Sequence, residues 1–451
     1  MKKTFFSLMV VSFLPQLSSA QESWVNFQYR ASNEKLMANI SRSDTPPGFI
    51  VASPSKSDPN YYFHWVRDAA LVMSALQQSL PFEKQKPLFV DYIKLVNQHQ
   101  QIWKITGQGE PKFNPDGTSF SLPWGRPQND GPALRSIVLV RHALELIKTG
   151  QTDYVKSHLY GGKIPANTVI KRDLEYVSHN WRKHDFDLWE EVKGHHFYTR
   201  YVQRSALVLG AQLAEQLGDN GAAVWYRKQA AQLSQELEKH WSAEKNYILS
   251  TRNRVDGLPY KHTNLDASII LAVNHASLPG LSFSVTDERV IATAWELIDT
   301  FKDIYPINSK FEGVGIGRYP EDRYFGGNPW FLLTAGLGEY LFKLANEYKS
   351  KPKFNVSIIS KKFFKKFLGY EFTHSLIVDQ LTTTQIVSKL NARGDQFLNR
   401  IRRHAYSDGR LDEQFDKYTG FMKGARDLTW SYAAFLTSVN AKRNGIDAKV
   451  R

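Results

Sequence analysis

The sequence of 451 residues predicts an all-α fold, an (α/α)6 barrel in which twelve helices form a toroid of inner and outer rings. Three observations predict it. Apolar residues recur at i, i+3 and i+4 spacing in one segment after another, strand-like alternation is nearly absent, and loops rich in polar and aromatic residues precede every second helical segment. No Pro/Gly/Ser-rich linker or low-complexity tract interrupts this pattern, which therefore favours one helical domain over two.

Twelve helical segments follow one another along the chain. In order, they are expected at 26–40, 66–80, 86–105, 131–149, 164–182, 196–218, 220–241, 265–276, 284–303, 328–348, 381–404 and 425–443. A further short helix is expected at 355–368, within a concentration of lysines between 349 and 366. There the lysines repeat at helical spacing around Phe363, Phe364 and Phe367. We interpret this segment as a solvated amphipathic helix rather than a binding patch, because no nucleic-acid motif accompanies it.

The polar–aromatic loops indicate how these helices are arranged. The loops lie just before the even-numbered helical segments, at 61–68, 124–131, 189–191, 262–266, 317–322 with 327–330, and 411–416 with 425–427. If helices alternate between an outer and an inner ring, the N-termini of all inner helices meet at one end, and the six loops converge on one mouth. Helix capping accounts for one Asp in each loop. It does not account for the Trp, Arg and paired Glu beside it, so we expect the functional site at this mouth.

The first 20 residues have the features of a secretory signal peptide. Lys2 and Lys3 form a positive start, 5–14 is an apolar core, and Ala20 ends a small-residue cleavage site. A signal anchor is the alternative. No later stretch reaches about 18 apolar residues, so we expect no stable membrane insertion. The prediction is a signal peptide at 1–20 and a single domain at 21–451, secreted or periplasmic and monomeric.

Composition limits the classes of protein and partner. The chain has no cysteine, so an exported form must be held together by its core, for which 42% hydrophobic and 13% aromatic residues supply the material. The formal net charge of +14 is mostly scattered along the chain, and we expect no nucleic-acid partner. His195 and His196 stand as a lone pair without an HExxH pattern, so no metal or other cofactor is expected.

The segment Asp187-Leu188-Trp189-Glu190-Glu191-Val192 carries the clearest chemistry. A glycosidase needs one carboxylic acid that is protonated near neutral pH and a second carboxylate that manages water. The alternative is an acidic first turn of the helix that follows, because Asp and Glu favour helix N-termini. The residues alone leave open whether Glu190 or Glu191 is the acid. The loops also hold Trp and Tyr, which stack on sugar faces, and Asp, Arg and Asn, which bind sugar hydroxyls.

These residues together resemble glycoside hydrolase family 15, the glucoamylase family, over about 45–345 and 405–440. The resemblance rests on nine motifs: Ala52-Ser53-Pro54-Ser55, Trp65-Val66-Arg67-Asp68, Gly109-Glu110-Pro111-Lys112-Phe113-Asn114, Trp124-Gly125-Arg126-Pro127-Gln128, Asp187-Leu188-Trp189-Glu190-Glu191, Gly317-Arg318-Tyr319-Pro320-Glu321-Asp322, Gly327-Asn328-Pro329-Trp330, Glu413-Gln414-Phe415-Asp416 and Ala425-Arg426-Asp427-Leu428-Thr429-Trp430-Ser431-Tyr432.

The resemblance implies a function and a set of site residues. The activity would be release of β-D-glucose from the non-reducing ends of α-1,4-glucans (starch, glycogen, maltooligosaccharides), with slower action on α-1,6 bonds. Glu190 matches the general acid and Glu413 the general base of an inverting mechanism, for which the carboxyl groups should lie roughly 6.5–9.5 Å apart. The matching substrate-binding residues are Tyr61, Trp65, Arg67, Asp68, Trp124, Glu191, Arg318 and Trp330. For Trp330, simple core packing is the alternative.

The sequence also departs from the family pattern. The departures are His64, Val66, Asn129, Lys193, His195 and His196, and we expect them at outer sugar subsites, where they would affect the preferred chain length. No starch-binding module is expected. Two alternatives remain open: another α-glucoside such as trehalose, isomaltose or dextran as substrate, or a non-catalytic glycan-binding or regulatory protein. The second is disfavoured because both carboxylates and the Arg residues are present.

Overall fold

A computed structural model of the chain describes residues 19–310, 312–351, 353–371 and 376–447. Most of the predicted signal peptide, residues 1–18, lies outside the described residues. The first helix, α1, begins at Ser19, so it includes the predicted cleavage site at Ala20. Within the described part, no helix is both long enough and apolar enough to cross a bilayer.

The all-α prediction is confirmed, and each of the twelve predicted segments overlaps a helix, with ends that differ by up to several residues. These helices are α1 (Ser19–Met37), α2 (Val66–Ser79), α3 (Phe82–Gln101), α4 (Asp130–Lys148), α6 (Val169–Asn180), α7 (Phe197–Gln216), α8 (Asn220–Glu238), α9 (Ser268–Ala276), α10 (Glu288–Ile304), α11 (Phe331–Lys349), α12 (Gln380–His404) and α13 (Thr429–Asp447). The short α5 (Thr152–Tyr154) and a π-helical turn at Val155–Leu159 were not predicted.

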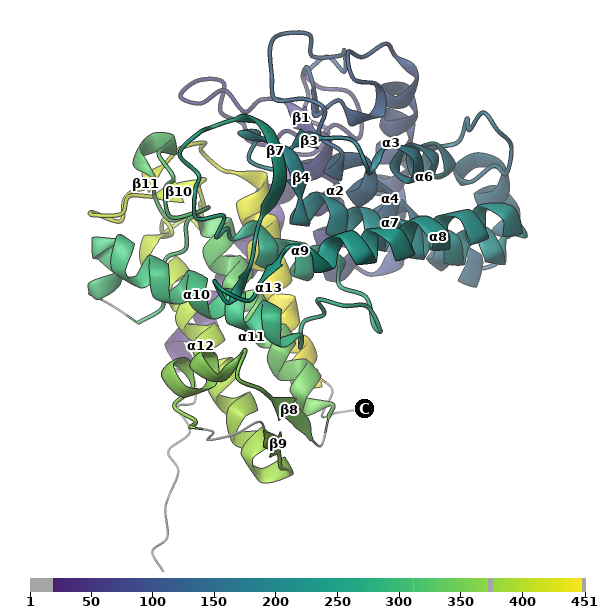
Figure 1. Ribbon diagram of the computed structural model, residues 1–451. Helices are drawn as coiled ribbons and strands as arrows, with labels where there is room; N and C mark the ends of the chain where they lie inside the picture. The colour runs from purple at the N-terminus through teal and green to yellow at the C-terminus, as the bar shows by residue number, and fades with distance from the viewer. Residues whose placement is uncertain (1–18, 311, 352, 372–375, 448–451) are drawn as a thin grey trace, which may run out of the picture.

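The helices form two rings, as the alternation of loops predicts. The inner ring consists of α2, α4, α7, α9, α11 and α13, which contact one another in that order, and α13 closes the ring by packing on α2. The outer helices pack on inner neighbours, for example α8 on α7 and α12 on α11. Figure 1 shows the yellow α13 beside the green α11, although the two are separated by α12 in sequence.

Burial distinguishes the two kinds of helix. The inner α7 is buried on nearly all sides, including its polar residues Arg200 and Gln203. The outer α8 buries one stripe, whose members Tyr226, Ala230 and Leu233 recur at helical spacing. A helix apolar on one face covers a core, whereas a helix surrounded by other helices is buried all round. The periodicity in the sequence therefore reports the outer helices more directly than the inner ones.

Short paired strands, which the sequence analysis underestimated, cross-link loops between the helices. They are β1 (His64–Trp65) with β2 (Lys112–Phe113), β3 (Asp185–Phe186) with β4 (Val192–His196) and β7 (Thr251–Gly257), β5 (Trp241–Ser242) with β6 (Tyr247–Ile248), β8 (Phe354–Val356) with β9 (Leu376–Val378), and β10 (Gln414–Phe415) with β11 (Met422–Lys423). Their pairing, all antiparallel, fixes loops that would otherwise lack backbone partners.

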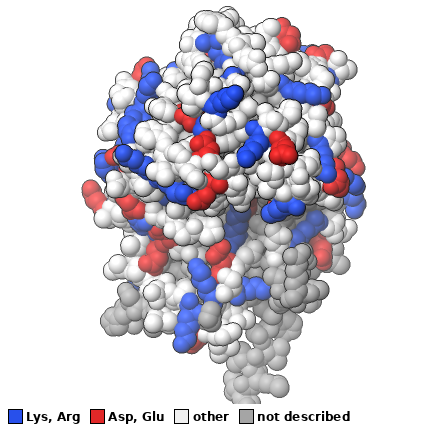
Figure 2. Space-filling model, turned by 90° about the vertical axis from the view of Figure 1, so that its right-hand side faces the viewer, with Lys and Arg blue, Asp and Glu red and all other residues white. Residues whose placement is uncertain are grey.

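The prediction of a helix at 355–368 is wrong in extent. Its first residues belong to β8, and regular helical structure is confined to a turn that ends with the π-helical Phe363–Phe367. The amphipathic arrangement nevertheless holds, because Phe363 and Phe364 are buried while Lys362 and Lys365 are exposed. Lys362 pairs with Glu296 at 3.1 Å. On the face shown in Figure 2, Lys and Arg side chains are interspersed with Asp and Glu.

Candidate active site

A cavity of about 540 Å³ lies at the N-terminal ends of the inner helices. The structure brings all ten predicted site residues together in its lining: Tyr61, Trp65, Arg67, Asp68, Trp124, Glu190, Glu191, Arg318, Trp330 and Glu413. They come from five of the six predicted loops, and Trp430 from the start of α13 adds to the wall. Five of the six loops predicted to converge on one mouth therefore line this cavity, and the loop at 262–266 does not.

Glu190 lies in a turn between β3 and β4, not in a helix. Its backbone N–H donates to the carbonyl of Asp187 at 2.9 Å, and its φ of 67° is in the left-handed region. The carboxylate of Asp187 accepts the N–H groups of Glu191 and Val192, which ties the turn together. Because α7 begins only at Phe197, the alternative of an acidic first helical turn is wrong.

One oxygen of the Glu190 carboxyl is held by donors from two other loops. Oε1 accepts the indole N–H of Trp65 at 2.6 Å and the amide N–H of Gln128 at 2.9 Å, and Nη2 of Arg67 lies 3.7 Å away. No partner of Oε2 is found among the described residues. The side chain is 17% exposed, and it lines the cavity. Glu190 is thus fixed in place with one oxygen free to meet a ligand.

Glu413 is fully buried, and its carboxyl also has one engaged and one unengaged oxygen. Oε2 accepts from the side-chain amide of Gln414 at 3.1 Å and the backbone N–H of Ala425 at 3.3 Å, whereas Oε1 has no hydrogen-bond partner among the residues that the structure describes. Burial raises the pKa of Glu413 to about 7, and the Ala425 N–H and the nearby Tyr61 hydroxyl oppose this rise. The group is a carboxyl that can exchange a proton near neutral pH.

Arg67 and Asp68 form a charged corner at the start of α2. Arg67 donates to Gln128 at 2.9 Å and pairs with Asp130 at 3.1 Å and with Asp68 at 3.5 Å. The Nε of Arg67 is the atom that faces Asp68, and it makes no hydrogen bond among the described residues. Burial raises the pKa of Asp68 to about 6, and the charge of Arg67 opposes the rise. A guanidinium and a carboxyl group side by side suit the hydroxyl groups of a sugar.

Arg318, which lies far from Arg67 in the sequence, forms a second charged corner of the same cavity. Asp322 accepts from its Nε at 2.8 Å and from its Nη2 at 2.6 Å, which holds the guanidinium in a bidentate pair. Nη2 also lies 2.7 Å from Glu191, whose other oxygen accepts from the Tyr319 hydroxyl at 2.6 Å. Burial raises the pKa of Glu191, and Arg318 opposes this.

Aromatic side chains line the walls. Trp124 is 37% exposed at the rim, and its ring lies 6.2 Å from that of Trp65. Trp330 lines the cavity but is only 6% exposed, so its ring both packs in the core and forms part of the cavity wall. The Tyr61 hydroxyl is hydrogen-bonded to that of Tyr324 at 2.7 Å.

Several residues of the site were missed by the sequence reasoning. Gln128 and Asp322 lie in motifs that had been singled out, but nothing marked them as partners of Glu190 and Arg318. Lys112, also in a motif, is 1% exposed, and its Nζ lies 3.2 Å from the Trp124 ring centroid. Tyr324 lies between two motifs and had no signal. A search for side chains able to hold the predicted charges in place would have found Gln128 and Asp322.

The expected location of the departures from the family pattern is wrong for most of them. His64, Val66, Asn129 and His196 are each at most 2% exposed, and they do not line the cavity. Asn129, for example, accepts from the Tyr176 hydroxyl behind the site. Among the described residues, no group of three or more His, Cys, Asp or Glu side chains is placed to hold a metal ion.

Comparisons with known proteins identify this arrangement. The family model described as glycosyl hydrolases family 15 matches residues 30–440. The chain belongs to this family. It is 37% identical over 436 residues to a glucoamylase of Blastobotrys adeninivorans, covering 90% of this chain and 69% of the relative. It is 36% identical over 448 residues to glucoamylase 1 of Rhizopus oryzae, covering 95% and 72%.

Solved structures of family 15 members agree with the fold. The family 15 glucoamylase of Hypocrea jecorina superposes with a TM-score of 0.87 at 30% identity, covering 94% of this chain and 72% of that one. The glucoamylase of Saccharomycopsis fibuligera gives 0.87 at 29% identity, covering 95% and 96%. The predicted (α/α)6 barrel and the resemblance to family 15 are confirmed. The protein is a glycosyl hydrolase, an exo-acting α-glucosidase of the glucan 1,4-α-glucosidase type that acts on an α-glucan.

Proposed function

We propose that this family 15 enzyme hydrolyses its α-glucan with inversion, with Glu190 as general acid and Glu413 as general base. One observation carries the proposal: both carboxyl groups line the same cavity, and each has one oxygen held by N–H donors while the other is unengaged. A carboxyl used for proton transfer must be fixed in position and still present an oxygen to the reacting group.

In the proposed reaction, the free Oε2 of Glu190 donates a proton to the departing glycosidic oxygen. The indole of Trp65 and the amide of Gln128 then stabilise the carboxylate that forms, because both donate to Oε1. Arg67, at 3.7 Å, adds a positive charge. Trp65 and Arg67 are thus proposed to serve the acid as well as the sugar.

Glu413 is proposed to accept a proton from the attacking water through its unengaged Oε1. The raised pKa of Glu413, which burial sets at about 7, makes its carboxylate a stronger base than an exposed glutamate. A water activated from one side while the acid acts from the other yields β-glucose. Room for that water requires carboxyl groups roughly 6.5–9.5 Å apart, and about 5 Å would instead indicate retention.

The charged corners account for attack at chain ends. Arg67, Asp68 and Arg318 are at most 8% exposed and line one cavity, so we propose that they bind the hydroxyl groups of the terminal glucose. A glucan that continued beyond that residue would bury these charges against carbon, which is costly. Glu191, paired with Arg318, is proposed to bind the next sugar, and Tyr61, Trp124 and Trp330 to shape the path.

The substrates proposed are starch, glycogen and maltooligosaccharides, with α-1,4 bonds cleaved faster than α-1,6 bonds. We also propose that residues 1–20 direct export to the periplasm or the medium and that 21–451 act as one catalytic domain, as a monomer and without a nucleic-acid partner. The positive start, the apolar core and the small-residue end of the N-terminal segment support export. N-terminal sequencing of the exported protein and its size in solution test these points.

An anomer-resolved product assay on maltoheptaose tests the mechanism. We expect glucose as the first product, released as the β-anomer. Glu190→Gln and Glu413→Gln should each lower kcat by roughly 10²- to 10⁴-fold. Initial release of α-glucose, or unchanged turnover in either variant, would refute the assigned roles. Rates on maltose, isomaltose, trehalose and dextran, measured in parallel, test the linkage preference.

A further inference from the structure

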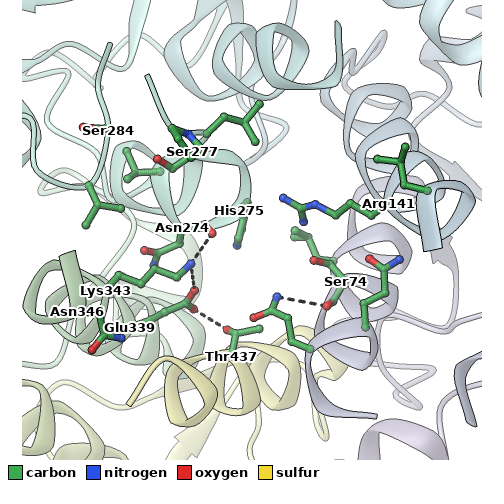
Figure 3. A pocket seen from close by; sticks show the side chains of 18 of the residues that line it. Ser74, Arg141, Asn274, His275, Ser277, Ser284, Glu339, Lys343, Asn346 and Thr437 are labelled. Carbon is green, nitrogen blue, oxygen red and sulfur yellow. Dashed lines mark hydrogen bonds and ion pairs between the residues drawn. The ribbon is translucent and has the colours of Figure 1, made fainter. Parts of the chain in front are cut away.

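A second cavity, of about 1360 Å³, lies at the opposite end of the barrel from the proposed active site. Its lining comes from the C-terminal parts of the inner helices. Gln77 near the end of α2, Arg141 in α4, His275 in α9, Lys343 in α11 and Thr437 in α13 all face it. Figure 3 shows these walls surrounding a common space, with the guanidinium of Arg141 extending into it. The proposed hydrolysis uses none of these residues.

Arg141 is the unusual member of this lining. Within the part of the chain that the structure describes, it makes no hydrogen bond, ion pair or ring contact. Burial lowers its pKa, and no carboxylate offsets that effect. The glutamate one turn further along α4, Glu145, is engaged by Lys148 at 2.6 Å. A partly buried guanidinium with no anion is unfavourable, since desolvation is not repaid by a partner.

The other charges of the lining are already balanced. Glu339 is paired with Lys343 at 2.6 Å and accepts from the Thr437 hydroxyl at 2.6 Å. Lys343 also donates to the carbonyl of Asn274 at 2.7 Å, and Figure 3 shows this network on one wall. The remaining pair is Glu347 with Lys351, at 3.9 Å. Among the described lining residues, Arg141 is therefore the one cation without a carboxylate, and the cavity carries an excess positive charge.

The histidine of the lining adds no charge. His275 is hydrogen-bonded to the Tyr198 hydroxyl through Nδ1 at 2.9 Å, and burial lowers the pKa of His275 to about 3, so the ring is neutral. The side-chain oxygens of Asn274 and Gln77 have no hydrogen-bond partner among the described residues, but they are covered by protein and do not face the cavity. The guanidinium of Arg141 is therefore the group that a ligand would meet.

From this combination we infer that the second cavity is a binding site for a small anion, whose phosphate or carboxylate group pairs with Arg141. A guanidinium binds either anion through two parallel hydrogen bonds. This site is distinct from the proposed active site and goes beyond the proposed hydrolysis.

The two cavities share one wall. Trp430 lines both of them. Its ring lies 6.1 Å from that of His275 on the side of the second cavity and is stacked 6.5 Å from that of Trp189 on the side of the active site. Occupation of the second cavity therefore acts on a side chain that also contacts the glucan path. Intrinsic tryptophan fluorescence offers a direct readout of that contact.

Calorimetric titration of the full chain with inorganic phosphate, glucose 6-phosphate, gluconate and glucose tests the site. We expect glucose 6-phosphate or gluconate to bind more tightly than glucose, and the tighter of the two identifies the anion as phosphate or carboxylate. Arg141→Gln should weaken that binding roughly ten- to hundred-fold, since hydrogen bonds to a charged group are lost. Arg30→Gln, which removes an exposed arginine of α1, should leave it unchanged.

Thermal unfolding shows whether the variant is folded. Because Arg141 has no partner to lose, Arg141→Gln should unfold at or above the wild-type temperature without ligand, and glucose 6-phosphate or gluconate should raise only the wild-type and Arg30→Gln temperatures. Maltose hydrolysis by Arg141→Gln should match the wild type. Failure of both sugar anions to bind the wild-type chain would overturn the proposal. So would equal binding by Arg141→Gln, and neither result depends on the roles of Glu190 and Glu413.

Discussion

Replacing Glu413 by glutamine should stabilise the protein at alkaline pH while strongly lowering its activity. Burial raises the pKa of Glu413 from an ordinary 4.5 to about 7. A carboxyl whose pKa is higher in the folded state holds its proton more tightly there, so ionising it costs folding free energy. Below pH 4.5 the folded and unfolded chains both carry the proton, and no penalty exists. Above pH 7 both have lost it, and the penalty is complete.

The magnitude follows from the two pKa values. A change from 4.5 to about 7 corresponds to about 3 kcal/mol, lost from the wild type as pH rises through that interval. Glutamine resembles the protonated acid in shape. Its carbonyl can accept from Gln414 and Ala425 as Oε2 does now, and its NH2 group can occupy the place of the unpaired Oε1. The variant should therefore escape the penalty without losing these hydrogen bonds.

Thermal or urea unfolding of wild type and Glu413→Gln at pH 4.5, 6 and 8 measures the difference. We expect similar stability at pH 4.5 and an advantage for the variant that grows to about 3 kcal/mol at pH 8. Asp68, whose pKa is also raised, contributes the same slope to both proteins and cancels. Glu244→Gln, at an exposed position, should show no such trend. A difference that is independent of pH, or largest at pH 4.5, would refute the burial argument.

Three further predictions concern the walls of the site. Gly424→Ala should lower kcat strongly, because a Cβ there would lie 2.1 Å from Oε2 of Glu413 and must displace it; steady-state rates on maltose measure this. Arg318→Ala should raise KM and destabilise the fold by about 3–5 kcal/mol, since it leaves Asp322 buried without its partner, as urea unfolding would show. Trp124→Ala should raise KM for maltotriose with little change in melting temperature, because this ring is 37% exposed at the rim.

Each of these predictions has a control. Gly150 has a positive φ of 83° and nothing within 4 Å of an added Cβ, so Gly150→Ala reports the cost of backbone strain alone. Equal effects of the two glycine variants on kcat would contradict the proposed displacement of Glu413. Arg318→Lys keeps the charge but not the bidentate geometry, and it should fall between wild type and alanine. For Trp124, an unchanged KM would contradict a position on the substrate path.

The fold could be predicted from sequence because the helical period and the order of loops are both local signals. Outer helices such as α8 can be predicted because each has one apolar stripe. The loops before α2 and α4 carry residues that helix capping does not explain. The segment at 355–368 failed for a physical reason. Its phenylalanines have the spacing of a helix face, but β8 pairs with β9, a strand some twenty residues away, and sequence periodicity does not report such pairing.

The residues of the site could be predicted from the sequence, but the hydrogen bonds that hold them in place could not. The ten site residues named from the sequence all line the cavity, and each is chemically conspicuous. The donors that hold them were not named, because Gln128 is an ordinary amide until the chain brings it 2.9 Å from Glu190. Tyr324 is similar, since its hydroxyl gains a role only beside that of Tyr61. Roles that depend on a distant partner are absent from the local sequence.

The adjacency of Glu190 and Glu191 shows how backbone conformation assigns different surroundings to neighbours in sequence. With φ of 67° at Glu190, the chain turns sharply between the two side chains. Glu190 then meets Trp65 and Gln128 from the first two loops, whereas Glu191 meets Arg318 and Tyr319 from the fifth. The left-handed turn, which costs a non-glycine residue about 1–3 kcal/mol, is retained here where two carboxylates must face different groups.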